Sequence, residues 1–114
     1  MKQLAIFAVI ALVLSSCGSG TPVTFQNSSE HRLEQVVLSG SGFEKSLAAV
    51  SPGQLIRARV HPTGESALAV SFTAKGQHFN YEPQGYFEGG GMYKVSATVG
   101  RDLSVVVDSE IGPY

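Results

Sequence analysis

The feature that most constrains the fold is a strict alternation of apolar and polar side chains over short runs. In 67–74, Leu68, Val70 and Phe72 occupy every second position, and the same period of two recurs over 54–61 and 92–99. Successive side chains of a β-strand point to opposite faces, so this period indicates strands with one buried face. Strands of that kind are typical of antiparallel sheets rather than of buried parallel ones. The chain is therefore predicted to be all-β.

Turn-forming residues separate these runs at short intervals. Gly, Pro, Asn and Ser cluster at 27–29, 40–42, 51–53, 62–64, 75–76, 89–91 and 100–102. Such residues provide a fixed φ, a positive φ or a side chain that bonds its own backbone. The strands that they delimit are predicted at 23–26, 33–39, 44–50, 54–61, 67–74, 78–81, 86–88, 92–99 and 103–107.

The spacing of these strands predicts an antiparallel two-sheet sandwich of about seven to nine short strands. An immunoglobulin-like or transthyretin-like topology is expected, and an open barrel is the alternative. The chain has one cysteine and no tryptophan, so the paired cysteines around a tryptophan that mark immunoglobulin domains are missing. The prediction therefore concerns architecture rather than family.

The first seventeen residues have a different character. Lys2 precedes the apolar run 4–14, and Ser15, Ser16 and Cys17 follow it. This run is too short to span a bilayer and has the length of a signal-peptide core. Together with the end Leu14-Ser15-Ser16-Cys17, it resembles the signal peptide and lipobox of bacterial lipoproteins. The resemblance covers only residues 1–18.

The resemblance implies the processing and the location of the chain. Cleavage between Ser16 and Cys17 would remove a signal helix, and Cys17 would carry an S-diacylglyceryl group and an N-acyl chain. The predicted parts are a signal peptide (1–16), a lipidated cysteine with a flexible tether (17–22) and a β-sandwich domain (23–114). Two or three acyl chains anchor a protein far more firmly than one. In Gram-negative lipoproteins, a residue other than Asp after the lipidated cysteine favours export to the outer membrane. Gly18 therefore implies an outer-membrane location, with the domain facing the periplasm.

Charge and cysteine content limit the partners and the chemistry of the mature part. Residues 17–114 carry seven Lys and Arg against nine Asp and Glu, a formal charge of −2. No basic stripe or polybasic patch is visible along the chain, so nucleic-acid binding has no electrostatic support and the lipid is expected to provide the membrane attachment. Once Cys17 is acylated no thiol remains, so the domain is expected to fold without a disulfide.

No set of residues in the sequence predicts a reaction. His31, His61 and His78 are far apart and form none of the close pairs that zinc sites use. No G-x-S-x-G motif occurs, and the carboxylates nearest the aromatic segment are isolated beside turns. We therefore expect no catalytic residue, no metal site and no cofactor, and the protein is predicted not to be an enzyme.

The most distinctive part of the mature chain is its aromatic segment. Tyr81, Tyr86, Phe87 and Tyr93 surround the turn residues 83–85 and 89–91. Tyrosine combines apolar area with a polar tip, so these four residues are a candidate surface for a glycan or a peptide edge. Because neighbours in a strand face opposite sides, Tyr86 and Phe87 cannot both be buried by one sheet face. In the alternative interpretation, Tyr81 and Tyr93 cap the core with their hydroxyls at its rim.

Taken together, the sequence favours a non-enzymatic, lipid-anchored module at the outer membrane that binds an envelope protein or glycan or has a structural role. A periplasmic inhibitor or adaptor, for example of a lysozyme, is the second hypothesis. The best-known lysozyme inhibitors of this kind have a disulfide and a Ser-Gly-x-x-Tyr-type stretch, and this chain lacks both. An envelope hydrolase is the third hypothesis.

Overall fold

The computed structural model describes residues 20–112, and all regular secondary structure in this range is β-strand. The predicted signal helix, the cleavage site and Cys17 lie outside the described residues. The eight strands are β1 (Thr21–Asn27), β2 (Glu34–Gly40), β3 (Phe43–Leu47), β4 (Leu55–Val60), β5 (Glu65–Ala74), β6 (Gln77–Glu88), β7 (Tyr93–Val99) and β8 (Val105–Ile111).

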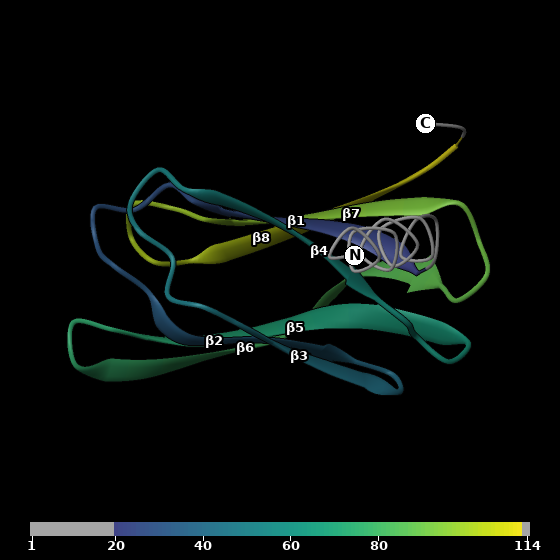
Figure 1. The fold of residues 1–114 in the computed structure, drawn as a ribbon, viewed down its shortest axis with the longest axis horizontal. Helices are drawn as coiled ribbons and strands as arrows, with labels where there is room; N and C mark the ends of the chain where they lie inside the picture. The colour runs from purple at the N-terminus through teal and green to yellow at the C-terminus, as the bar shows by residue number, and fades with distance from the viewer. Residues whose placement is uncertain (1–19, 113–114) are drawn as a thin grey trace, which may run out of the picture.

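The strands form two four-stranded sheets that stack face to face (Figure 1). One sheet has the order β4-β1-β7-β8 and the other β3-β2-β5-β6. All neighbours pair antiparallel except β1 and β7, which run parallel. The predicted all-β sandwich is confirmed. The strand order differs from the immunoglobulin arrangement, in which the first, second, fourth and fifth strands share a sheet, so the transthyretin-like alternative remains.

The core lies between the sheets and follows the alternation of the sequence. Leu68, Val70, Phe72 and Ala74 of β5 are each at most 2% exposed, as their shared face predicts. The other buried apolar side chains come from both sheets and from three loop positions: Val23, Phe25, Leu33, Val36, Leu38, Val50, Val60, Phe87, Val95, Ala97, Val99, Leu103, Val105 and Val107. Packing of these side chains supplies the main stabilisation of a domain that has no disulfide among its described residues.

The predicted break at 83–85 is wrong, because β6 runs unbroken from Gln77 to Glu88. Its pairing with β5 shifts register twice between Ser66 and Val70. The extra residues of β6 are absorbed there as bulges, and Gly85 takes a φ of 75°. β6 is an edge strand, where the missing amide of Pro83 is tolerated.

Other predicted boundaries also need correction: β3 ends at Leu47 rather than at 50, and β8 runs to Ile111 rather than to 107. β1 begins at Thr21, so residues 21–22 belong to the sheet and not to the tether. Pro22 is accommodated because pairing with β7 starts only at Val23. β8 starts at Val105 rather than at 103, since Leu103 has a φ of 68° and belongs to the preceding turn.

Candidate functional site

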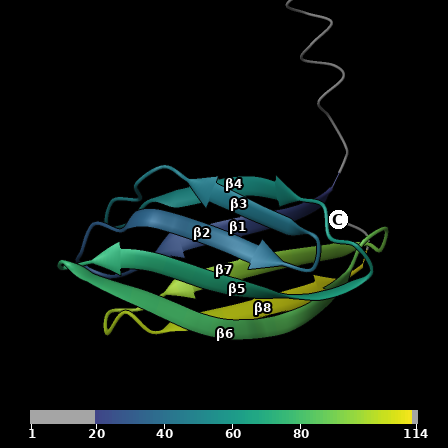
Figure 2. The same ribbon diagram turned by 90° about the horizontal axis from the view of Figure 1, so that it is seen from below.

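The edge strands of the two sheets meet in pairs along the two sides of the sandwich. Figure 2 shows β3 and β4 together along one side and β6 and β8 along the opposite side. We call the β6/β8 side the closed seam and the β3/β4 side the open seam. The first is bridged by side chains, and the second contains a groove.

At the closed seam, side chains of one edge strand bond the backbone of the other. The Gln84 amide of β6 donates from Nε2 to the Val105 carbonyl at 3.1 Å and accepts at Oε1 from the Val107 N–H at 3.3 Å. Ser109 Oγ of β8 donates to the Tyr86 carbonyl at 2.6 Å and accepts from the Tyr86 N–H at 3.3 Å. These side chains take the place of a neighbouring strand for part of each edge.

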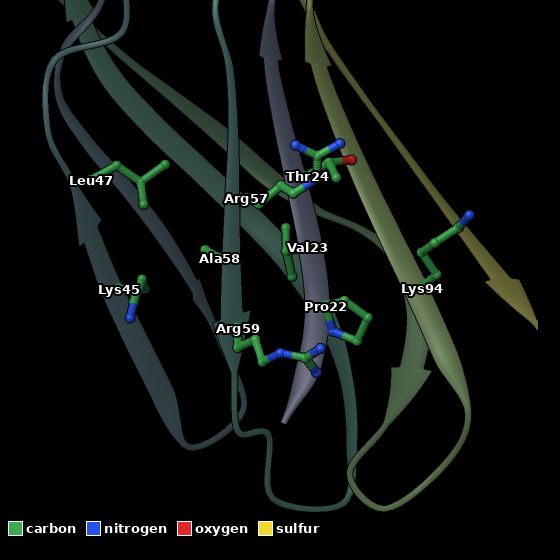
Figure 3. A pocket seen from close by; sticks show the side chains of 9 residues that line it. All are labelled: Pro22, Val23, Thr24, Lys45, Leu47, Arg57, Ala58, Arg59 and Lys94. Atoms are coloured by element: carbon green, nitrogen blue, oxygen red, sulfur yellow. The ribbon is translucent and has the colours of Figure 1, made fainter. Parts of the chain in front are cut away.

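At the open seam, a groove of about 570 Å³ extends along β4 (Figure 3). Lys45 and Leu47 of β3 lie on one side of β4 in this view, and Pro22, Thr24 and Lys94 lie on the other. The nine lining residues are Pro22, Val23, Thr24, Lys45, Leu47, Arg57, Ala58, Arg59 and Lys94. None of these nine residues is acidic or aromatic.

Strand register explains why four cations gather here. Arg57 and Arg59 are alternate residues of β4 and lie opposite Thr24 and Pro22 of β1. Lys94 belongs to β7, the other neighbour of β1. Lys45 lies on β3 opposite the buried Leu38, so it shares the inward-facing side of that strand.

These four residues are more than half of the seven Lys and Arg in residues 17–114. The expectation of no basic patch was based on the order of residues along the chain, and the fold brings four cations spread over 45–94 to the lining of one groove. Acidic groups lie at the margins of the groove. Glu44 lines an adjoining hollow together with His61, and Glu110 of β8 is the cross-strand partner of Lys94.

Three of the four predicted surface aromatics, Tyr81, Phe87 and Tyr93, are buried or packed against the core. Phe87 is fully buried and is therefore not a binding-surface residue. Tyr81 is partly buried, stacks on Phe72 with ring centroids 6.0 Å apart, and donates its hydroxyl hydrogen to the Leu103 carbonyl. Burial, and secondarily the charge of Asp102, raises the pKa of Tyr81. This is the capping role that the alternative interpretation gives to Tyr81, and Tyr93, which it also names, packs against the core as well.

Tyr86 is the neighbour of Phe87 on β6, and Tyr93, at the start of β7, is on the same face of its strand as the buried Val95. Tyr86 is 45% exposed, and its ring meets that of the half-buried Tyr93 edge to face at 6.0 Å. The Tyr86 hydroxyl donates to the Glu88 carboxylate, and this bond raises the pKa of Tyr86 well above its usual range. The prediction that Tyr86 and Phe87 face opposite sides is confirmed. Of the predicted aromatic surface, the exposed part is Tyr86, with the half-buried Tyr93 beside it.

The histidines are separate in the fold as well as in the sequence. His31 lies in the loop before β2, His61 follows β4, and His78 belongs to β6. Within residues 20–112, no group of three or more His, Cys, Asp or Glu side chains is placed to hold a metal ion. The same range contains no helix that is long and apolar enough to cross a membrane.

Comparison with known proteins gives information about the fold of this chain and none about its function. No protein-family model and no curated protein matches this chain. A solved structure described as the "NMR structure of the protein from Eubacterium rectale" aligns with a TM-score of 0.51 over 87% of this chain and 94% of its own, at 12% identity. At that identity the similarity shows a shared fold alone.

Proposed function

We propose that this chain is a non-enzymatic lipoprotein of the bacterial envelope that binds a negatively charged protein or glycan in the groove of the open seam. The observation that carries the proposal is the gathering of Lys45, Arg57, Arg59 and Lys94 around one groove whose lining includes no carboxylate. Carboxylates and phosphates form charge-assisted hydrogen bonds with such groups, and arginine binds them in a bidentate manner.

The proposed anchor would place this groove close to the membrane. Only residues 18–20 separate Cys17 from the start of β1, a reach of about 10 Å at the usual rise of an extended chain. Arg59 Nη1 donates to the Gly20 carbonyl at 3.2 Å, so one end of the groove lies beside the tether. We therefore expect the partner to be met at the periplasmic surface of the outer membrane.

The anchor is tested through Cys17. Replacing Cys17→Ser removes the thiolate that would accept the diacylglyceryl group, so palmitate labelling should disappear and the precursor should accumulate at its full length. Gly18→Asp provides a second test, with an expected shift toward the inner membrane in a Gram-negative host. Normal processing of Cys17→Ser would refute the lipoprotein proposal.

The groove is tested with two anionic probes, poly-L-glutamate and polygalacturonate, on the full-length protein in detergent. Both arginines of β4 are replaced in one variant, Arg57→Gln with Arg59→Gln. The matched control is Arg32→Gln with Arg101→Gln, which removes the same charge from exposed ion pairs outside the groove lining. We expect salt-dependent binding of at least one probe that the β4 variant loses and the control keeps. Equal binding by the two variants would refute the groove as the site.

An inhibitor or adaptor remains the alternative within the same geometry. In that case the negatively charged partner is an envelope enzyme, and occupancy of the groove changes its activity. Inhibition of a purified lysozyme that is lost in the β4 variant and kept in the control would select this alternative.

A further inference from the structure

The four edge strands of the sandwich differ in how their unpaired backbone is protected. β6 and β8 are bridged by the side chains of Gln84 and Ser109. β3 has Lys45 on its inward-facing side, and an inward-pointing charge is a known device that blocks strand pairing. The remaining edge, β4, pairs with β1 over six consecutive residues without a register shift. It also contains no proline.

An edge of this kind presents alternate backbone N–H and C=O groups that a further strand can bond. We propose that an extended acidic segment of another envelope protein adds to β4 and lies in the groove of the open seam. The inference rests on the proposed function and names the class of partner: a polypeptide bound by strand addition.

The two faces of β4 specify the side chains of the segment. Arg57 and Arg59 point outward, and directly opposed residues of an added strand bring their Cβ atoms about 4.5–5.5 Å from these positions. Asp or Glu is favoured there. The inward face of β4 has Ala58, with Leu47 of β3 across the groove. Small apolar residues are favoured on that side, so the motif alternates acidic and apolar residues.

A second copy of this chain does not fit the edge. Antiparallel pairing of β4 with another β4 in the register centred on Ala58 sets Arg57 against Arg59 of the other copy, and the registers centred on Arg57 or on Arg59 set that arginine against itself. Like charges directly opposed across two strands are destabilising. The charges of this edge therefore reject self-association and accept an acidic strand.

A glycan also fits the lining poorly. The nine residues of the groove include no aromatic ring on which a sugar could stack and no side-chain amide or carboxylate that could bond its hydroxyls. The groove offers cations, aliphatic surface and a strand edge. A peptide uses all three.

The first experiment selects the partner class without assuming a sequence. A phage library of random dodecapeptides is panned against the full-length protein in detergent. We expect enriched peptides in which acidic and apolar residues alternate, and about tenfold or greater loss of affinity in the variant Arg57→Gln with Arg59→Gln. The control Arg32→Gln with Arg101→Gln should bind as the parent does.

The second experiment tests the backbone contact. The strongest enriched peptide is synthesised in two forms, each N-methylated at alternate residues, so that one form blocks the amides facing β4 and the other blocks those facing away. Only one form should lose binding, since a strand bonds its neighbour through every second residue. Bound peptide should also slow hydrogen exchange of β4 amides. Equal effects of the two forms would overturn strand addition.

The remaining outcomes separate the inference from the function on which it rests. If no peptide is enriched but polygalacturonate, or vesicles of phosphatidylglycerol, bind through Arg57 and Arg59, strand addition is wrong and an anionic-ligand groove stands. A dimer formed through β4 would likewise overturn the inference. If the arginine variant and the control behave alike with every probe, both proposals fail.

Discussion

Each of the two seams of this sandwich is formed by a pair of edge strands from opposite sheets. One seam is bridged by side chains, and the other contains a groove. At the closed seam, Gln84 and Ser109 bond the backbone of the facing strand. At the open seam, a groove lined by Lys45, Arg57, Arg59 and Lys94 separates the edges. The difference suggests a division of labour, with stability gained on one side and a binding surface kept on the other.

The free energies expected for the interactions at each seam agree with that division. A hydrogen bond between protein groups contributes about 0.5–1.5 kcal/mol net, and an edge group left unpaired in a partly buried place costs more. Exposed cations contribute little to folding, but they bind anions strongly when a partner removes water. The predictions below test the contrast, from the largest expected change in the free energy of unfolding to the smallest.

The largest effect is expected from Phe72→Ala. Phe72 is fully buried on β5 and stacks on Phe79 and Tyr81 of β6, with centroids 5.4 and 6.0 Å apart. Removing the ring should lower the free energy of unfolding by about 3–5 kcal/mol in urea titrations. The matched change at the open seam, Leu47→Ala, should cost only about 1 kcal/mol because Leu47 is partly buried. Equal losses would contradict the proposed asymmetry.

The next largest loss of stability is expected when the Gln84 hydrogen bonds that bridge β6 and β8 are removed. Gln84→Ala removes one donor and one acceptor and leaves groups of Val105 and Val107 without that partner, so we expect a loss of about 1–3 kcal/mol. Gln84→Glu keeps the acceptor for the Val107 N–H but places a carboxylate oxygen against the Val105 carbonyl. It should therefore not restore stability at neutral pH. Full stability of Gln84→Ala would show that the closed seam does not need its bridge.

A pH-dependent effect is expected at the turn between β7 and β8. Hydrogen bonds from the Ser104 hydroxyl and the Ser104 N–H to Asp102 Oδ1, at 2.6 and 3.1 Å, lower the pKa of this carboxyl from its usual 3.8. Because the folded pKa lies below the unfolded one, the stabilisation is present above the unfolded pKa and is lost as the pH falls through the folded pKa.

Asp102→Ala should therefore be less stable than the parent at neutral pH, and the difference should shrink on acidification from about pH 5 to about pH 2. Urea titrations at several pH values measure this difference. Asp108→Ala, an exposed acidic residue of β8, serves as the control for a general change in charge. A gap between Asp102→Ala and the parent that is independent of pH would contradict the assigned hydrogen bonds.

The smallest effect on stability is expected at the open seam. Arg57→Gln with Arg59→Gln should change the free energy of unfolding by less than about 0.5 kcal/mol, because both residues are exposed. The same variant is expected to lose anion binding. A large loss of stability would mean that these arginines hold the fold together, and the division between the seams would then be wrong.

Particular residues show how far the sequence alone could predict the structure. The alternation over β5 predicts correctly that Leu68, Val70, Phe72 and Ala74 share the buried face. The prediction fails at 83–85, where turn-forming residues lie inside β6. Bulges that form against β5 absorb them, and local propensity gives no information about a neighbouring strand.

The candidate site was predicted less well. The aromatic segment was chosen because its residues are close in sequence, and the structure buries Phe87 and turns Tyr81 toward the core side. The cations of the groove were missed because Lys45 and Lys94 are far from Arg57 and Arg59 in the sequence. The alternation of these two arginines along one strand was the only available signal.

The class of the fold can be read from the sequence, because strands with a period of two and frequent turn residues bury one face each by forming an antiparallel sandwich. The sequence also supplied the lipobox resemblance on which the proposed anchoring rests. Tertiary structure alone decided which edges are bridged and which is open, and where Lys45, Arg57, Arg59 and Lys94 meet. The physical reason is that strand order and register bring together residues that are distant along the chain, and neither is encoded in any local stretch of it.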